Sequence, residues 1–176
     1  MRGLKERFRK FRNRKVSFFV VIGGVFRLFF SNDFSKIMGK ERGYAYFQDF
    51  IPFNNYDIRI IVIDNKAFAI KRMVRNNDFR ASGSGNIIYE KEEIDKHTIE
   101  LSFEISEKLK SGCLAFDFVY DNFNPLITEV SYGFSVEGYD KCPGYWDNKL
   151  NWHEGTFNPQ SWMVDMIAND IRYKKR

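Results

Sequence analysis

The segment Tyr46–Arg59 has the sequence YFQDFIPFNNYDIR, and together with Lys66–Arg72 (KAFAIKR) it decides the fold. In both stretches charged residues interrupt apolar runs and recur where those runs end, and Asp57 and Arg59 alternate with Ile58 and Ile60. A repeat of two is typical of β-strands. We therefore predict strands over 58–63 and 67–74, joined by a tight hairpin at Asp64-Asn65.

Similar patterns predict the remaining strands. An earlier strand is expected over 44–51, closed by Pro52, which cannot donate a backbone hydrogen bond, and followed by a turn at Asn54-Asn55. Two further strands are expected over 114–120 and 126–130, about a turn at 121–124. These segments should form hairpins.

Two helices complete the predicted architecture. Between Lys91 and Lys110, apolar residues recur near helical spacing, and Gly112 follows as the expected stop: Ile94, Leu101, Ile105, Leu109. Asn158-Pro159 is an N-cap followed by proline at the first helical position, so a C-terminal helix should run to about Ile171. The order of elements predicts an α+β fold with a mainly antiparallel sheet and packed helices.

Charge divides the chain into two parts. Residues 1–15 hold eight Lys and Arg against one acid, a net +7, whereas the other 161 residues hold 20 Lys and Arg against 22 Asp and Glu. We expect an arm and apolar segment over 1–43 and a globular lobe over 44–176. The basic arm is either a solvated amphipathic helix or a contact for nucleic acid or anionic lipid. A nearly neutral lobe argues against nucleic-acid binding.

The apolar stretch 16–30 is 15 residues long and contains Arg27, which is short for a membrane span. A buried or interface segment, a signal or anchor, and a span are the alternatives, so peripheral membrane contact through residues 1–30 stays open. Cys113 and Cys142 show no disulfide-scaffold or zinc spacing, which favours a reducing, cytoplasmic location. A Cys142–His153 nucleophile pair is a weak alternative.

Asp117 and Glu129 are the sharpest candidate pair. In a hairpin about residues 121–124 they occupy paired positions and so face the same side of the sheet. Two facing carboxylates repel each other unless a cation or proton lies between them, and Mg²⁺ would satisfy both through oxygen ligands. The alternative is that each carboxylate points to solvent or pairs with a lysine.

A second group of charges surrounds the first hairpin. Asp57 and Arg59 lie on one face of their strand, and Lys71-Arg72 ends the partner strand, with Arg80 following. Clustered Arg and Lys suit phosphate oxygens, whereas the alternative is an exposed face with ordinary ion pairs. The loop 82–86 (SGSGN) is either an anion cradle or a flexible connection.

These motifs, taken in order, resemble the ATP-grasp superfamily of carboxylate–amine ligases, especially the branch of glutathione synthetases and peptide-glutamate ligases. The resemblance covers about 44–131 and implies the C-terminal lobe of that fold. It rests on the following residues: Tyr46–Ile51, Asp57-Ile-Arg59, Ala69-Ile-Lys-Arg72, Asp78-Phe-Arg80, Asp117 and Glu129-Val-Ser131.

The resemblance implies a set of site residues. The strand Phe47, Gln48, Asp49, Phe50 would hold adenine, and Asp57 would lie near the ribose. Arg72 and Arg80 would face phosphate or the acyl-phosphate, with Arg59 and Lys71 as weaker candidates. The implied Mg²⁺ ligands are Asp117, Glu129 and Ser131. Serine replaces the family's usual asparagine, which puts the second metal position in doubt.

The implied activity is ATP- and Mg²⁺-dependent amide formation from a small-molecule or peptide carboxylate and an amine, through an acyl-phosphate. The first 43 residues lack the phosphate-binding lysine strand and small-residue loop of the family's preceding lobe. We therefore expect an incomplete or shortened module. The rival hypothesis is a non-catalytic remnant or interaction module that docks through its basic N-terminal arm, with homodimerisation left open.

Overall fold

The computed structural model describes residues 8, 10–12, 17–19, 22–23, 47–75 and 79–174, the side chains of 170 and 172–174 excepted. The chain divides into two compact units, Met1–Gln48 and Asp49–Arg176. In the first unit residues 8, 10–12, 18–19 and 22–23 are helical. Most of the predicted arm and apolar segment lies outside the described residues. No helix among those described is long and apolar enough to cross a membrane.

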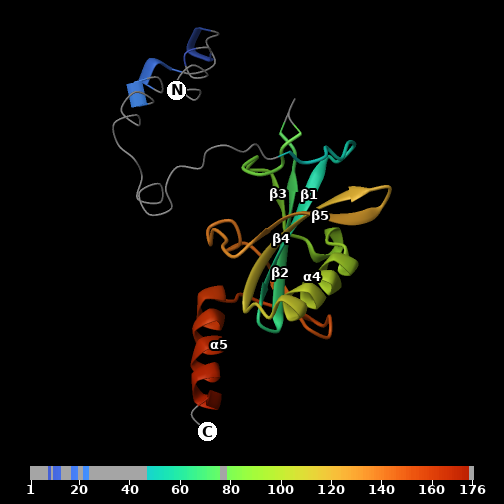
Figure 1. Cartoon of the computed structure of the whole chain (residues 1–176), viewed down its shortest axis with the longest axis vertical. Helices are drawn as coiled ribbons and strands as arrows, with labels where there is room; N and C mark the ends of the chain where they lie inside the picture. The colour runs from blue at the N-terminus through green and yellow to red at the C-terminus, as the bar shows by residue number, and fades with distance from the viewer. Residues whose placement is uncertain are drawn as a thin grey trace. The chain divides into compact units, whose positions relative to one another are not determined.

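The second unit is built on an antiparallel sheet (Figure 1). Strands β1 (Tyr56–Ile63) and β2 (Lys66–Met73) form the predicted hairpin, and Asp64 takes a left-handed backbone with φ 51° at its turn. The strand order is β5-β4-β1-β2-β6-β7, with β3 (Ile87–Ile88) also paired to β2. The prediction of an α+β fold with a mainly antiparallel sheet is confirmed.

The second predicted hairpin consists of β4 (Cys113–Asp121) and β5 (Asn124–Ser131). Its turn is two residues long, since Asp121 pairs directly with Asn124. A β-bulge shifts the register between Asp117 and Phe118, so Asp117 pairs with Glu129 while Phe118 pairs with Ile127. The bulge therefore brings the two predicted carboxylates to opposed positions.

Successive side chains along each strand point to opposite faces of the sheet, and both faces are buried. One face, the α4 face, packs Ile58, Ile60, Phe116 and Phe118 against Ile99 of α4 (Lys96–Leu109). The other, the α5 face, holds a second core cluster: Ile61, Ile63, Phe68, Ile70, Ala115, Tyr139, Cys142. Trp162 and Met163 of α5 (Pro159–Lys174) pack against that cluster. The charged ends of β1, β2 and β4 extend the α5 face.

The helix predicted over 91–110 begins later than expected. A 3-10 turn, η1 (Lys91–Glu93), precedes α4, and Asp95 caps α4 by accepting a hydrogen bond from the His97 backbone N–H. This cap opposes extension of the helix towards Lys91, because the Asp95 carboxylate binds the His97 N–H that a longer helix would bond to a backbone carbonyl. Lys110, with φ 51°, ends the helix before Gly112.

The buried stripe of α4 also differs from the prediction. Leu109 is exposed, and small hydroxyl residues join Ile99 against the sheet: Thr98, Ser102, Ser106. Thr98 and Ser102 donate their hydroxyls to carbonyls one turn earlier in the chain, which satisfies them inside the core. Ile94 is buried, and Leu101 and Ile105 pack against the same core as predicted, so only Leu109 of the predicted set is exposed.

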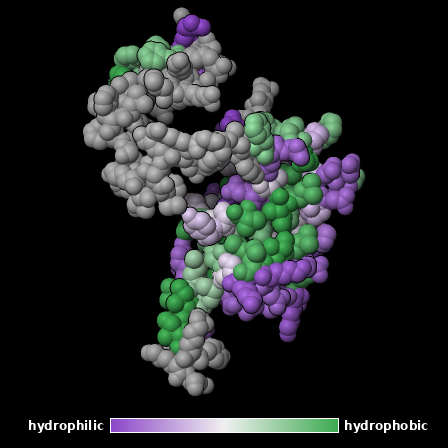
Figure 2. Space-filling model, in the orientation of Figure 1, coloured by the Kyte–Doolittle hydropathy of each residue, from purple (hydrophilic) through white to green (hydrophobic). Residues whose placement is uncertain are grey.

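The C-terminal helix agrees with its prediction. Asn158 accepts a hydrogen bond from the Ser161 backbone N–H at 2.9 Å, and Pro159 opens α5. Near the start of the helix Trp162 stacks on Phe157, with ring centroids 4.9 Å apart. Further along, Val164, Ile167 and Ile171 are exposed, and α5 accordingly presents apolar surface in Figure 2.

One predicted strand does not form in the described residues. Residues 47–51 of the segment 44–51 have no strand structure, and Phe47 and Phe50 are exposed. A strand needs hydrogen-bonding partners, and the sheet described here begins at Tyr56. Instead of forming the predicted turn alone, Asn54 exchanges hydrogen bonds with the backbone of Tyr120 and so ties this segment to β4.

Strands β6 (Gly144–Asp147) and β7 (Trp152–Glu154) were not predicted. They extend the sheet past β2, and Trp146 is buried in contact with Trp152, at a centroid distance of 4.6 Å. Gly144 allows this pairing, because a Cβ there would overlap the His153 carbonyl oxygen of β7. The tryptophans therefore contribute packing.

We expect Gly144→Ala to lower the free energy of unfolding by about 2 kcal/mol, because overlap with backbone forces β7 away from β6. Urea denaturation followed by tryptophan fluorescence measures this. Gly138→Ala is the matched control, since its added Cβ would lie 3.9 Å from the Ser135 carbonyl oxygen, an ordinary contact. Equal stability of the two variants would contradict this role for Gly144.

Candidate functional site

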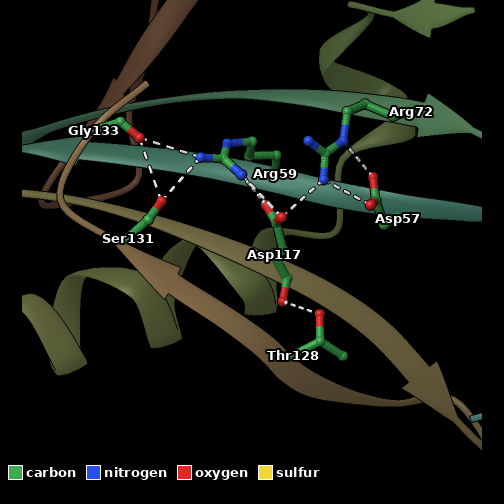
Figure 3. Close-up of polar contacts among 7 residues, drawn as sticks. All are labelled: Asp57, Arg59, Arg72, Asp117, Thr128, Ser131 and Gly133. Atoms are coloured by element: carbon green, nitrogen blue, oxygen red, sulfur yellow. Dashed lines mark hydrogen bonds and ion pairs between the residues drawn. The ribbon is translucent and has the colours of Figure 1, made fainter. Parts of the chain in front are cut away.

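Four charged side chains meet on the α5 face of the sheet (Figure 3). The register pairs Asp57 with Arg72 across β1 and β2, and Arg59 with Asp117 across β1 and β4. Paired positions face the same side, and residues two apart on β1 share a face. Antiparallel pairing therefore gathers these two arginines and two aspartates, the charged quartet, from three neighbouring strands.

Arg72 links the two aspartates of the charged quartet. Its Nε and Nη2 donate to Asp57 Oδ1 and Oδ2, each at 2.7 Å. Nη2 also lies 3.0 Å from Asp117 Oδ2. This fork of two parallel bonds is the geometry in which arginine binds a carboxylate most strongly. Arg72 is therefore held in place by both acids.

Arg59 holds the opposite side of Asp117. Its Nη1 donates to both Asp117 carboxylate oxygens at 2.9 Å. Its Nη2 donates to Ser131 Oγ at 3.0 Å and to the Gly133 carbonyl at 3.3 Å. Thr128, at the bulge, donates its hydroxyl to the Asp117 carbonyl at 3.1 Å. The bulge and the end of β5 thus help to position the charged quartet.

Burial makes this network depend on charge balance. Arg72 and Asp117 are 8% and 7% exposed, and the charged quartet is formally neutral. Burial raises the pKa of Asp57, although hydrogen bonds from Arg72 work against this. Burial alone would lower the pKa of Arg72, but bonding to Asp57 and attraction to Asp117 raise it. The Arg72 guanidinium therefore stays protonated throughout the pH range in which the protein is folded.

Tyr139 was not a predicted site residue. Burial raises its pKa to about 12, while interaction with Arg59 and Arg72 acts in the opposite direction. It packs against Phe68 with ring centroids 5.3 Å apart. Nothing in its local sequence signals this position, because the 134–142 segment has no regular structure of its own. Tyr139 therefore lies beside both the charged quartet and the aromatic cluster around Phe68.

Glu129 shares the α5 face with Asp117 but differs from it in environment. Its side chain is exposed, whereas Asp117 is buried. Within the described part of the chain, the Glu129 side chain has no hydrogen bond or ion pair. The Ser131 hydroxyl is already engaged in hydrogen bonds, since it accepts one from Arg59 and donates one to the Gly133 carbonyl at 3.3 Å. Glu129 is the accessible carboxylate of the predicted pair.

Lys71 lies apart from the charged quartet, and Arg80 and the segment 47–50 are exposed. Lys71 faces the α4 side, where its Nζ lies 2.7 Å from Glu93 and 4.1 Å from the Tyr56 ring centroid. Arg80 is exposed beyond β2. The segment Phe47–Phe50 is exposed, and the Phe50 and Phe79 ring centroids are 5.3 Å apart. The structure therefore groups Arg59 and Arg72 without Lys71.

The glycine–serine loop forms a defined turn. Gly83 and Gly85 adopt left-handed backbone angles of 69° and 77°, and the Ser84 backbone N–H donates to the Ala81 carbonyl. Arg75 donates to the Ser82 carbonyl at 2.7 Å. A Cβ on Gly83 would lie 2.8 Å from the Arg75 guanidinium, so glycine permits this contact. The loop carries a cation beside its backbone.

The weak alternative of a cysteine nucleophile finds no geometric support. Cys142 is buried with its Sγ 3.6 Å from the Ala69 carbonyl, and burial raises the pKa of its thiol to about 12. His153 instead contacts Asp147 Oδ2 at 2.9 Å. Both cysteines are free thiols. A thiol with so high a pKa is almost fully protonated at neutral pH.

Native protein at pH 8 should therefore label slowly at Cys142, since a pKa of about 12 leaves roughly one thiol in ten thousand ionised. Labelling should increase as pH rises towards 12, and in urea both thiols should react quickly. Peptide mass spectrometry after timed alkylation measures each site separately. Half-buried Cys113 provides the internal comparison. Rapid native labelling of Cys142 would contradict the buried state.

Known protein families supply an independent comparison. The antiparallel sheet with packed helices and the ordered charged motifs are those expected of an ATP-grasp lobe. A family model described as the RimK-like ATP-grasp domain matches residues 31–145, about two thirds of the chain. The chain therefore belongs to the RimK-like ATP-grasp family. A search of curated proteins gave no match.

Family membership identifies the general activity. The chain is an ATP-dependent, ligase-type module with an ATP-binding domain. The matched region contains β1 to β5 and therefore the whole charged quartet. It also extends upstream of Tyr44, where the sequence resemblance had begun. The superfamily prediction is confirmed.

The paired carboxylates of Asp117 and Glu129 are the candidate ligands for a divalent metal. In the described ranges, no three His, Cys, Asp or Glu side chains come together as a metal cage. Mg²⁺ in nucleotide sites needs one or two carboxylates, and its other ligands are water and phosphate oxygens. Asp117 and Glu129 provide two oxygen donors at paired positions. This donor set fits Mg²⁺ accompanied by phosphates.

Asp117→Asn should lower the free energy of unfolding by about 3 kcal/mol, because it leaves two guanidiniums without the buried anion between them. Urea denaturation measures the change. Asp140→Asn, at an exposed position, controls for the loss of one charge and should change stability little. If both substitutions cost the same, Asp117 does not hold the network together.

Proposed function

We propose that this ATP-grasp module binds Mg–ATP on its α5 face and serves amide formation between a carboxylate and an amine through an acyl-phosphate. The observation that carries this proposal is the opposed pair Asp117 and Glu129 beside two arginines. Carboxylates for a metal and guanidiniums for phosphate are the groups that phosphoryl transfer requires. The two free thiols suit a reducing cytoplasm.

Each residue has a role in this proposal. Asp117 and Glu129 would hold the metal, with Ser131 beside them. The bound metal would neutralise phosphate charge and orient the phosphates. Arg72 and Arg80 would face the transferred phosphate, while the 47–50 segment would contact adenine and Asp57 would lie near the ribose. Lys71 has the weakest support, because it points to the α4 face.

The charged quartet suggests how the site responds to ATP. Arg59 and Arg72 already neutralise Asp117, so a metal at Asp117 brings two further positive charges to the same carboxylate. Phosphate oxygens can accept the same pair of parallel hydrogen bonds from a guanidinium as a carboxylate does. Arginine contacts would then move from Asp117 towards phosphate as the carboxylate turns to the metal. Each guanidinium would then exchange a carboxylate partner for a phosphate partner.

Isothermal titration calorimetry with ATP tests this proposal, with and without Mg²⁺. We expect Mg²⁺-dependent binding that Glu129→Gln weakens at least tenfold, because the metal loses a negatively charged ligand. Glu129 is exposed and unpaired among the described residues, so the same substitution should leave the unfolding free energy within about 0.5 kcal/mol of the wild-type value. Loss of binding then reports on the site and not on folding.

Glu137→Gln is the control at another exposed glutamate and should bind as the wild type does. ATP binding that ignores both Mg²⁺ and Glu129 would contradict the proposed metal site. Complete absence of ATP binding would favour the alternative, a non-catalytic remnant that acts through its basic arm. Either result leaves the family assignment intact, because that assignment rests on the sequence match.

A further inference from the structure

Two phenylalanines adopt an unusual backbone and are almost fully exposed. Phe53 has φ 67° and is 98% exposed, and Phe123 has φ 69° and is 96% exposed. A left-handed backbone is unfavourable for a bulky side chain, and glycine is the usual residue at such positions. Phe123 is the second residue of a two-residue hairpin turn, where Asn-Gly is the common pair.

The other left-handed, non-glycine residues described have local reasons for their conformation. Asp64 and Asn122 are turn residues of the types that tolerate it, and Lys110 ends α4. Leu150 is strained as well, but its side chain packs against the core of the α4 face. Phe53 and Phe123 gain no such burial. Strain that folding does not explain points to function.

Both phenylalanines line one pocket of about 740 Å³ at the end of the sheet. Tyr56 and Tyr120 also line it, and both pack against the core of the α4 face. The charged quartet lies on the opposite, α5 face. This volume lies within the usual range of small-molecule sites, roughly 300–1,000 Å³. The pocket is therefore separate from the proposed Mg–ATP site.

The charge of the pocket lining selects the ligand. Asp95 and Asp121 line it, and none of the described lining residues is Lys, Arg or His. Asp121 uses Oδ1 to accept from Asn122, which leaves its other oxygen available. Asp95 accepts from the Tyr120 hydroxyl at 3.2 Å, and burial, with Asp95, raises the pKa of that hydroxyl. An anionic ligand is disfavoured here.

We propose that this pocket binds an organic cation, a guanidinium or alkylammonium group carried on an apolar body. Aromatic faces attract such cations and cover their apolar parts, and carboxylates complete the contact. The cation belongs either to a free small molecule or to an arginine or lysine side chain of a peptide. In both cases Phe53 and Phe123 contribute the aromatic contacts for which their strained backbone is retained.

The test uses the full chain and two probes of the same shape. N-acetylargininamide carries a positive charge, and N-acetylcitrullinamide is neutral. Titration followed by NMR should show saturable binding of the arginine probe and at least tenfold weaker binding of the neutral probe. Phe123→Gly and Asp121→Asn should each weaken arginine binding at least tenfold. Phe123→Gly should also raise the melting temperature, because glycine relieves the backbone strain.

Phe79→Ala and Asp140→Asn are the matched controls, and both should leave binding of the arginine probe unchanged. The peptide acetyl-Gly-Arg-Gly-amide distinguishes the sources, since tenfold tighter binding than the single residue indicates a peptide ligand and equal binding indicates a small molecule. Equal affinity for the neutral probe, or unchanged binding by Phe123→Gly, overturns the proposal. A lower melting temperature for Phe123→Gly would assign Phe123 to folding instead.

Discussion

The buried carboxylate of Asp117, held between two guanidiniums, is the constraint on which the site depends. A buried charge is costly unless neighbouring charges and hydrogen bonds replace water. Arg59 and Arg72 meet this need from two different strands, and Asp57 balances the second guanidinium. The pairing of β1 with both β2 and β4 is therefore fixed by charge as well as by apolar packing. A one-residue slip would move each charge to the opposite face.

The bulge in β5 determines which residue lies opposite Asp117. In the hairpin itself, Asp121 pairs with Asn124, and an unbroken ladder of that register would place Thr128 opposite Asp117. The extra residue moves Glu129 into that position, and the Thr128 hydroxyl bonds back to the Asp117 carbonyl. The exposed acid and the buried acid thus meet on one face because of a single local irregularity. Bulges commonly direct side chains in this way.

Local sequence predicted much of the fold but not the partners within the site. Both hairpins and the cap at Asn158 follow from neighbouring residues, and so they were predictable. The salt bridge between Arg59 and Asp117 spans 58 positions and depends on which strands become neighbours, which alternation alone does not determine. The sequence could have predicted that Lys71 and Arg72 lie on opposite faces of the sheet, because adjacent residues of a strand face opposite sides. Asp95 likewise carried a cap signal that could have placed the start of α4.

The charged quartet and the aromatic pocket both contain residues in unfavourable states, but only in the quartet are those states compensated within the fold. On the α5 face, buried charges are balanced so well by one another that the network is formally neutral and supports the fold. At the pocket on the α4 side, Phe53 and Phe123 have neither burial nor a turn preference to offset their left-handed backbones. A sequence under selection for folding alone would replace them with glycine or asparagine at no cost in packing. Their presence beside Asp95 and Asp121 is therefore best explained by a ligand that the exposed rings contact.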